Sequence, residues 1–254
     1  MIIIIFKNYC IFETLINLAL NSVMKYINTV SGCKNCPYRA LIFGSLDNKE
    51  LDFLEKTRKE IFYKKGDVLT KEGTSINEFL YLKTGLLKVY KTRAGNKTHI
   101  IRIAGPSDFV SLLSMFSNDK YKYSIAAIED TTVCVVDSES IKFLAKSNGE
   151  FALELMKRMS YTYDEIIDST YRIRQKHLRG RIAYILLYFA QKVYRQNRFE
   201  LPISRREIGE LINMTTENVI RILSEFRKDQ IIFIDGKIIE IKDIERLERI
   251  KKIG

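Results

Sequence analysis

Residues 204–223 constrain the fold of this chain more than any other stretch. Apolar residues recur there three and four apart, as one face of a helix requires: Ile208, Leu211 and Ile212. Asn213 then follows, and asparagine tolerates the positive φ of a tight turn better than most residues. A second helical face comes next, capped by Thr215 or Thr216: Val219, Ile222, Leu223 and Phe226. Gly209 lies where the helices cross, so the stretch predicts a helix-turn-helix.

The outward face of the second helix carries side chains suited to reading DNA. They lie near its N-terminal end, which is the part of a recognition helix that meets base edges: Thr216, Glu217, Ile220 and Arg221. An ordinary amphipathic helix pair is the plain alternative. The segment that follows argues against it.

Two β-branched runs come directly after the second helix. They span Gln230–Ile234 and Lys237–Ile241, and Asp235-Gly236 between them is a two-residue hairpin signal. A hairpin in this place is the wing of a winged helix. Residues 171–254 also hold 19 lysines and arginines against 11 aspartates and glutamates, a balance of +8 out of the chain's +11. This charge fits attraction to DNA phosphates.

The middle of the chain changes to short β-rich runs from Ile61 to Val136. Examples are Asp67–Thr70, Phe79–Leu82, Leu86–Lys91, Thr98–Ile103, Tyr123–Ile128 and Thr132–Val136, with turns at Gly66, Gly73, Gly85 and Gly95. Such spacing is typical of a β-sandwich or barrel. We expect a jelly-roll-like compartment, and barrels of this kind commonly enclose a small ligand.

A long helix is predicted over Gly149–His177, followed by a core helix at Gly180–Arg195. Apolar and aromatic residues recur along the long helix near helical spacing: Leu155, Met159, Tyr163, Ile166 and Ile173. They could pack on the chain's own barrel, but we favour a dimer seam because helix-turn-helix proteins usually bind DNA as dimers. The predicted divisions are residues 1–30, 31–148, 149–178 and 179–254.

Composition limits the other classes of protein. The 254 residues suffice for one large or two ordinary domains, and no uncharged N-terminal run nears the roughly 18–20 residues of a membrane span. We favour Met24 as the true start, with a packed N-terminal helix as the alternative. The sequence has no phosphate loop, triad spacing or paired-carboxylate motif, so we expect no enzyme. The rival class is a cyclic-nucleotide-type regulatory subunit that acts on a partner protein.

The order of parts resembles the Crp/Fnr family. The resemblance runs from about Cys33 to Ile241 and is most specific in KKGDVLTKEG, LYLKTGLLKVY, GPSDFVSLLSMF and the helix-turn-helix. It implies an α+β fold: an N-terminal double-stranded β-helix of the cyclic-nucleotide-binding type, a long dimerisation helix and a C-terminal winged helix-turn-helix. It also implies a cytoplasmic, homodimeric transcription regulator that binds double-stranded DNA and contacts RNA polymerase.

The resemblance assigns roles within the DNA motif. The family pattern E-x-x-x-R is present as Glu217 and Arg221, which would read the G·C pair of a TTGA-like or TGA-like half-site. Glu217 would also orient Arg221. Neither branch signature is present at Thr216 and Ile220. Further positions match residues that hold phosphates: Ser204, Arg205, Thr215, Asn218 and Lys237.

The sensor residues match neither known branch. Cyclic-AMP binding in the family needs a Glu and an Arg-Ser pair, and here Leu112 and Tyr123-Ser124 stand in those places. A phosphate without its guanidinium loses a charge-assisted contact, so we expect no cyclic-AMP binding in the family's manner. The effector stays open between redox, nitric oxide, haem and another small molecule.

Cysteines offer a partial match to an iron–sulfur site. Cys33, Cys36 and Cys134 fall where three of the family's four cluster ligands lie, but the fourth position is Ile42. Cys10 could replace it only if the N-terminal segment folds back. Cys134 could instead be a small core residue, and Cys33 with Cys36 could form a thiol redox switch. Zinc is the weaker alternative, because structural zinc needs four ligands.

Overall fold

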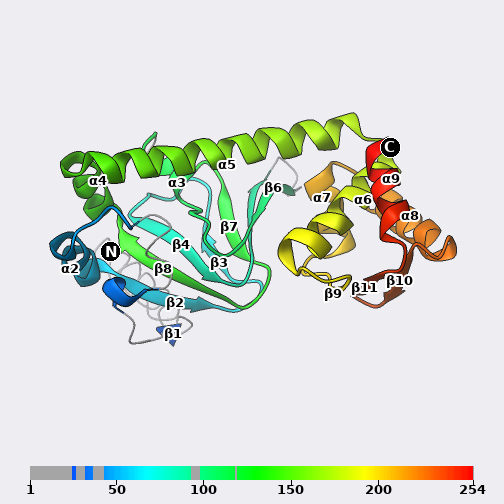
Figure 1. The fold of residues 1–254 in the computed structure, drawn as a ribbon, viewed down its shortest axis with the longest axis horizontal. Helices are drawn as coiled ribbons and strands as arrows, with labels where there is room; N and C mark the ends of the chain where they lie inside the picture. Colours follow the sequence, from blue (N-terminus) through cyan, green and yellow to red (C-terminus); the bar gives the residue numbers. More distant parts are fainter. Residues whose placement is uncertain (1–24, 27–31, 37–42, 93–97, 118, 254) are drawn as a thin grey trace, which may run out of the picture.

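The structure is a computed structural model, and it describes residues 25–26, 32–36, 43–92, 98–117 and 119–253. A β-roll lies at one end, a winged-helix domain at the other, and one long helix runs along both (Figure 1). Of the predicted N-terminal extension, only β1 (Lys25–Tyr26) is described. The expectations about the first 23 residues and Cys10 therefore lie outside the described residues.

Two four-stranded antiparallel sheets form the roll, with strand orders β1-β2-β8-β4 and β3-β7-β5-β6. The β-rich runs expected from the sequence are strands, and β2 is an addition that the sequence analysis left out. The bounds are β2 Lys59–Tyr63, β3 Val68–Thr70, β4 Glu78–Thr84, β5 Leu87–Thr92, β6 Thr98–Ala104, β7 Ser124–Ala127 and β8 Thr131–Asp137.

Helices cover the ends and one face of the roll. They are η1 (Cys33–Asn35), α2 (Asn48–Thr57), α3 (Leu112–Met115), α4 (Ser138–Ser147) and the long α5 (Gly149–Gln175). Local capping fixes their starts. Asp47 and Glu50 form a capping box at α2, and the Asn148 side chain accepts the Phe151 amide at α5, which satisfies amides that a helix start leaves open.

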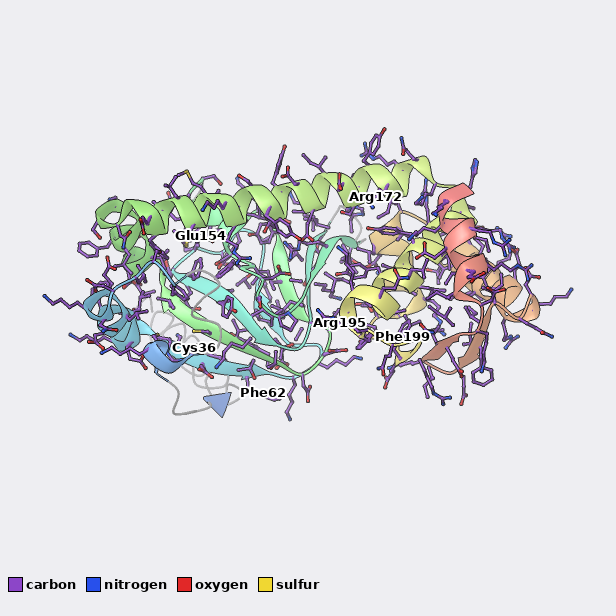
Figure 2. All side chains as sticks on the ribbon, in the orientation of Figure 1. Cys36, Phe62, Glu154, Arg172, Arg195 and Phe199 are labelled. Carbon is purple, nitrogen blue, oxygen red and sulfur yellow. The ribbon has the colours of Figure 1, made fainter. Side chains whose placement is uncertain are left out.

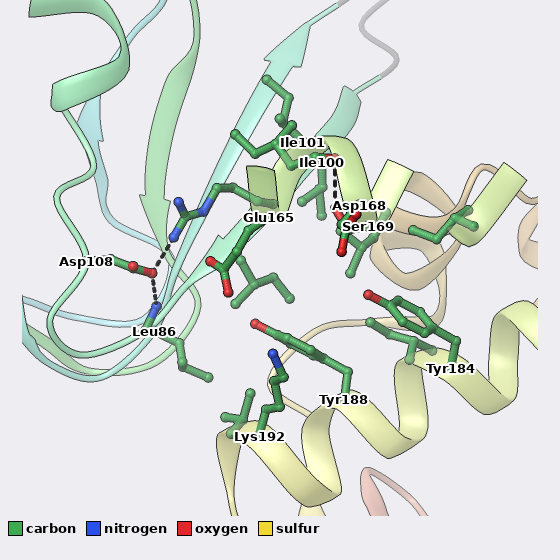
Figure 3. A pocket seen from close by; sticks show the side chains of 18 of the residues that line it. Leu86, Ile100, Ile101, Asp108, Glu165, Asp168, Ser169, Tyr184, Tyr188 and Lys192 are labelled. Atoms are coloured by element: carbon green, nitrogen blue, oxygen red, sulfur yellow. Dashed lines mark hydrogen bonds and ion pairs between the residues drawn. The ribbon is translucent and has the colours of Figure 1, made fainter. Parts of the chain in front are cut away.

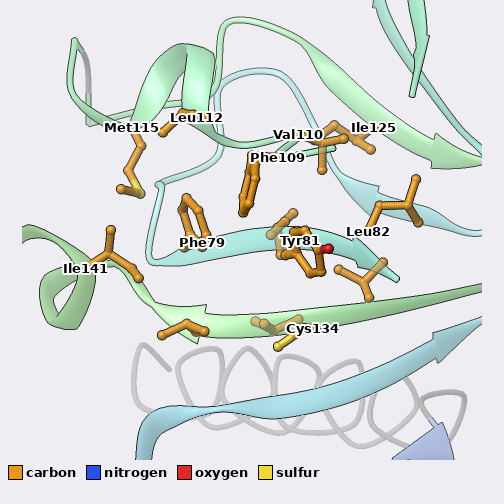
Figure 4. Packing of buried hydrophobic residues seen from close by; sticks show 14 of the residues in the cluster. Phe79, Tyr81, Leu82, Phe109, Val110, Leu112, Met115, Ile125, Cys134 and Ile141 are labelled. Atoms are coloured by element: carbon orange, nitrogen blue, oxygen red, sulfur yellow. The ribbon is translucent and has the colours of Figure 1, made fainter. Parts of the chain in front are cut away.

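Large side chains fill the centre of the roll (Figure 4). The Phe109 ring packs against Phe79 and Tyr81, at ring-centre distances of 5.2 and 4.8 Å. The hydroxyl of buried Tyr123 donates to the Val110 carbonyl at 2.9 Å. A hydrogen-bonded tyrosine thus stands where the family would place the arginine that holds a cyclic-nucleotide phosphate.

The C-terminal domain is a small helical core with a three-stranded wing (Figure 2). The helix predicted at 180–195 is α6 (Leu178–Leu187) followed by a π-helical turn, η3 (Tyr188–Val193). The helix-turn-helix is α7 (Arg205–Ile212) and α8 (Thr216–Lys228). The remaining elements are β9 (Arg198–Glu200), β10 (Ile232–Asp235), β11 (Ile238–Ile241) and α9 (Ile244–Ile253).

The two domains pack directly against each other. Leu86, Ile103 and Ile128 of the roll are buried in the same apolar cluster as the winged-helix core. Lys88 on β5 pairs with Glu207 on α7, with 2.5 Å between Nζ and Oε1. The roll therefore contacts the first helix of the helix-turn-helix within one chain.

Candidate nucleic-acid interface

Backbone geometry confirms the predicted turn between α7 and α8. Asn213 adopts the left-handed conformation, with φ 53° and ψ 58°, and ends α7. A Cβ on Gly209 would lie 2.5 Å from the Met214 carbonyl oxygen, closer than any real side chain approaches. The close approach of the turn at Met214 to α7 therefore depends on this glycine, whereas the sequence predicted that it lies where the two helices cross.

Side-chain caps begin both helices of the motif. Ser204 and Glu207 form a capping box at α7, and the Thr215 hydroxyl accepts the Asn218 amide at 3.3 Å at the start of α8. Thr215, rather than Thr216, is therefore the cap of the second helix. These bonds fix where α8 begins and which residues its outer surface presents.

The outer surface of α8 presents the predicted base-reading residues. Val219, Ile222, Leu223 and Phe226 are buried, so the opposite side of the helix faces solvent. Glu217 and Arg221 are exposed there, Thr216 is half-buried, and 51% of Ile220 is accessible despite its apolar side chain. An exposed isoleucine on this face suits apolar contact with a thymine methyl group.

Arg221 is held by partners other than Glu217. Its guanidinium donates to Asn218 Oδ1 at 3.2 Å and to Glu225 Oε1 at 2.5 Å. Bonds to a backbone amide at the helix start and to Thr215 lower the pKa of the Glu217 carboxyl. Within the described residues no hydrogen bond joins Glu217 to Arg221, because the positive N-terminal end of α8 attracts the carboxylate. That Glu217 orients Arg221 on DNA stays a prediction.

The wing hairpin lies where the sequence predicts it, but its two-residue turn is shifted by one residue. Asp235 pairs with Ile238, so the two turn residues are Gly236 and Lys237 rather than Asp235 and Gly236. Gly236 has a φ of +56°, and Lys237 occupies the tip. Arg205 donates to the Gly236 carbonyl at 2.8 Å, which ties the start of α7 to the wing. The described geometry therefore brings together three predicted phosphate-binding residues: Ser204, Arg205 and Lys237.

Comparisons with known proteins place both domains. Residues 60–148 match the family described as "Cyclic nucleotide-binding domain", and residues 180–250 match "Crp-like helix-turn-helix domain". The chain is 26% identical over 217 residues to the transcriptional activator protein FnrA of Stutzerimonas stutzeri, covering 83% of this chain and 88% of that protein. The chain belongs to the Crp/Fnr family. It is a DNA-binding transcription regulator and not an enzyme.

Other Crp/Fnr relatives agree in sequence and fold. The fumarate and nitrate reduction regulatory protein of Escherichia coli is 24% identical over 226 residues, covering 86% of this chain and 89% of that protein. The structure of FixK2 from Bradyrhizobium japonicum superposes with a TM-score of 0.70 at 24% identity, over 78% of this chain and 98% of that chain. A crp/fnr-family protein from Eubacterium rectale gives a TM-score of 0.71 at 19% identity, over 83% of this chain and 97% of that chain.

The long helix of this Crp/Fnr protein presents a different face from the predicted dimer seam. Leu155 is buried in the core of the roll, and Met159 packs against that core. Ile173 packs against the winged-helix core. Leu155 is therefore turned toward its own chain and away from the predicted seam. Met159 and Ile173 are only partly buried, and their place in the seam stays a prediction. Tyr163 is exposed, and Ile166 is half-buried.

Most of the exposed large apolar residues of α5 follow a heptad spacing of three and four. They are Leu153, Met156, Tyr163 and Ile167, with Tyr171 beside them, whereas exposed Tyr161 lies off this spacing. No element of the described chain covers this stripe, since each of these side chains is largely accessible. The spacing was present in the sequence, but a helix with two apolar stripes does not reveal which stripe faces the roll.

Cys33, Cys36 and Cys134, the cysteines that the structure describes, do not form a cluster site with other described side chains. Within the described residues, no group of three or more His, Cys, Asp or Glu side chains is placed to hold a metal ion. Burial, together with the nearby Glu55 carboxylate, raises the pKa of the Cys33 thiol to about 12. Burial likewise raises the pKa of Cys134 to about 11. In the metal-free chain both sulfurs are therefore protonated thiols at neutral pH.

A cleft of about 880 Å³ lies where the roll, α5 and α6 meet. Glu165, Tyr184, Tyr188 and Lys192 point toward its interior (Figure 3). Burial raises the pKa of the Tyr188 hydroxyl to about 12, so this group donates hydrogen bonds at neutral pH. The sequence analysis missed this cleft because its walls come from segments far apart in the chain.

No helix in the described part of the chain is long and apolar enough to cross a membrane.

Proposed function

We propose that this regulator binds palindromic DNA as a homodimer, with α8 of each copy in the major groove. The observation that carries the proposal is the exposed face of α8, on which Glu217 and Arg221 stand clear of the core. Arg221 can donate two hydrogen bonds to guanine, and Glu217 can accept one from cytosine. These contacts would read the G·C pair of a TTGA-like or TGA-like half-site.

The homodimer would form along the exposed stripe of α5. Large apolar side chains left accessible on a helix of 27 residues suit a second copy of the same helix, packed as in a coiled coil. Two copies joined in this way carry two recognition helices. Such dimers bind half-sites about 10 base pairs apart, one turn of DNA.

Ser204, Arg205, Thr215, Asn218 and Lys237 would contact phosphates and set the register. RNA polymerase is the expected partner of the DNA-bound dimer, and the cytoplasm is its expected location. The filled centre of the roll supports an effector other than cyclic AMP. Redox chemistry, nitric oxide, haem and another small molecule stay open as signals.

A gel-shift titration tests the proposal. The probe is a duplex with a TTGA-containing palindrome, and the competitor is the same duplex with scrambled half-sites. We expect the palindrome to bind at least about 10³-fold more tightly than the scrambled duplex at physiological salt. Equal binding of the two duplexes would contradict sequence-specific recognition.

A further inference from the structure

A second cleft, of about 580 Å³, opens beside the base-reading face. It lies between the start of α6, the middle of α8 and the C-terminal helix α9. The surface of the cleft is mainly apolar, and four arginines with His177 border it from all three elements: His177, Arg179, Arg221, Arg246 and Arg249. Leu178, Ile222 and Ile250 form its apolar floor, on which long arginine stems can lie.

Arg221 belongs both to this cleft and to the face that reads bases. The cleft is therefore continuous with the proposed DNA interface. In Figure 1, α9 lies against α6 beside α8, and the wing strands β10 and β11 lie below them. The wing side already supplies Arg205 and Lys237 as candidates for phosphate contact, and no residue of β10 or β11 lines the cleft.

The width of the DNA major groove indicates what this side of α8 would meet. The major groove is about 12 Å wide, and a helix with its side chains has a diameter of about 10–12 Å. A recognition helix in the groove therefore has a sugar-phosphate strand on each side. One strand would meet the wing, and the other would meet the arginine-lined cleft.

The arginines that border the cleft carry more positive charges than the nearby carboxylates neutralise. Arg179 donates to Glu225 at 2.6 Å and to Asp229 at 3.1 Å. Arg246 donates to the Asp229 carbonyl at 3.2 Å. The two carboxylates hold these arginines in place against four guanidinium groups, which leaves a positive balance. The start of α6 adds to it, because no side chain caps its first amides.

Arg249 is the cation best placed for a ligand. It is exposed, and within the described residues it makes no ion pair. Arg246 lies three residues earlier and shares its face of α9. Arg246 also pairs with Asp229 Oδ2 at 3.9 Å, whereas Arg249 keeps its full attraction for phosphate. An arginine can bind a phosphate through two N–H groups.

We propose that Arg249, with Arg246 beside it, binds the phosphate backbone that flanks the base-reading contacts, so that α9 is part of the DNA interface. The inference rests on the proposed DNA-binding function and extends it to a helix outside the helix-turn-helix and wing. Its contribution is independent of base sequence, because phosphates carry no sequence information.

The test measures DNA affinity of the full chain as a function of salt concentration. The variants are Arg249→Ala, Arg249→Lys and, as a control, Lys146→Ala on α4 of the roll, which removes an equally exposed charge far from the cleft. Each is titrated with the TTGA-containing duplex and with its scrambled form. Two lengths are used: one ends at the outer edge of each half-site, and the other extends about 10 base pairs, one turn, beyond it.

We expect Arg249→Ala to lower the slope of log K against log salt by about 0.9 on the long duplexes, scrambled or not. If the two proteins bind equally at 1 M salt, this difference in slope makes Arg249→Ala bind about eightfold more weakly than the parent protein at 0.1 M salt. Arg249→Lys should keep most of the affinity, and Lys146→Ala should match the parent protein. An unchanged slope for Arg249→Ala overturns the inference. Equal parent affinity for palindrome and scrambled duplex contradicts only the proposed function, because the slope on scrambled DNA still reports the Arg249 contact.

Discussion

Lys88 of the roll and Glu207 of the helix-turn-helix form an ion pair between the two domains, with 2.5 Å between Nζ and Oε1. Glu207 also accepts from the Ser204 amide at 2.9 Å, as part of the capping box of α7. The Glu207 carboxylate therefore both caps the start of α7 and attaches α7 to the roll. The sensor domain thereby contacts the first helix of the DNA-reading unit directly.

Glu207→Gln should separate these two roles. Glutamine can still complete a capping box, but it cannot pair with Lys88. We expect a loss of about 0.5–1 kcal/mol in the free energy of urea unfolding, and no further loss when Lys88→Met is added. Additive losses in the double variant would show that Lys88 and Glu207 do not interact.

The same carboxyl predicts a pH dependence. Burial opposes ionisation of Glu207, but the bonds from Lys88 and Ser204 outweigh it and lower the pKa of the carboxyl. A lowered pKa stabilises the folded state above the ordinary glutamate value, about 4.3, and this stability is lost as the pH falls through the folded pKa. The stability difference between the parent protein and Glu207→Gln should therefore shrink on acidification from neutral pH. A difference that stays constant down to about pH 3 contradicts this account.

Ile167→Glu should convert the dimer into a monomer. A buried charge in the centre of a helix seam is unfavourable, and Ile167 lies in the middle of the exposed stripe. Tyr161→Glu is the control, because Tyr161 is also exposed, at 60% against 47% for Ile167, but lies off the heptad spacing. Sedimentation equilibrium should give a dimer for the parent and for Tyr161→Glu. A dimeric Ile167→Glu would show that the copies associate elsewhere.

Leu155→Ala should act on stability rather than on assembly. Its side chain is buried in the core of the roll, so we expect a loss of about 2–5 kcal/mol in the free energy of unfolding. The folded fraction should still sediment as a dimer. Dissociation without loss of stability would restore Leu155 to the seam.

Thiol modification checks the state of the cysteines. Because the pKa of Cys134 is about 11 and that of Cys33 about 12, both thiols are protonated at pH 7. Alkylation of the native protein at Cys33 and Cys134 should therefore be far slower than in urea, and should accelerate as the pH rises. An anaerobically purified protein should lack sulfide-to-iron absorption bands. A brown protein with such bands would contradict the geometry of the described residues.

Cyclic AMP is expected not to bind. The hydrogen bond from Tyr123 to Val110 and the packing of Phe109 occupy the centre of the roll, and the sequence lacks the family's phosphate-binding arginine. Isothermal titration should give no heat of binding at micromolar concentrations of nucleotide. A saturable micromolar isotherm would overturn this expectation.

Local signals made the helix-turn-helix predictable. Asn213 and Gly209 each answer a backbone requirement within a few residues, and the apolar spacing of α7 and α8 is regular. The wing followed from a hairpin signal, with an error of one residue at Gly236. The β-rich runs were likewise readable from their short length and turn glycines.

Other features depended on packing between distant segments. Spacing on α5 allows two apolar stripes, and only the roll decides that Leu155 faces inward and Ile167 outward. The partner of Arg221 depends on competition between Asn218, Glu225 and Glu217, which the sequence does not resolve. The Lys88–Glu207 pair joins residues 119 positions apart, so no local pattern could indicate it.

The most direct test of base reading by α8 is a double-mutant cycle, in which Arg221 and the base pair assigned to it are changed separately and together. The parent protein and Arg221→Ala are titrated with a TTGA-containing palindrome and with the same duplex carrying A·T in place of each assigned G·C pair. The parent should lose about 1–3 kcal/mol of binding free energy per altered pair, whereas Arg221→Ala should lose less, because only the contact of Glu217 with the cytosine remains. If Arg221→Ala discriminates between them as strongly as the parent does, Arg221 does not read that base pair.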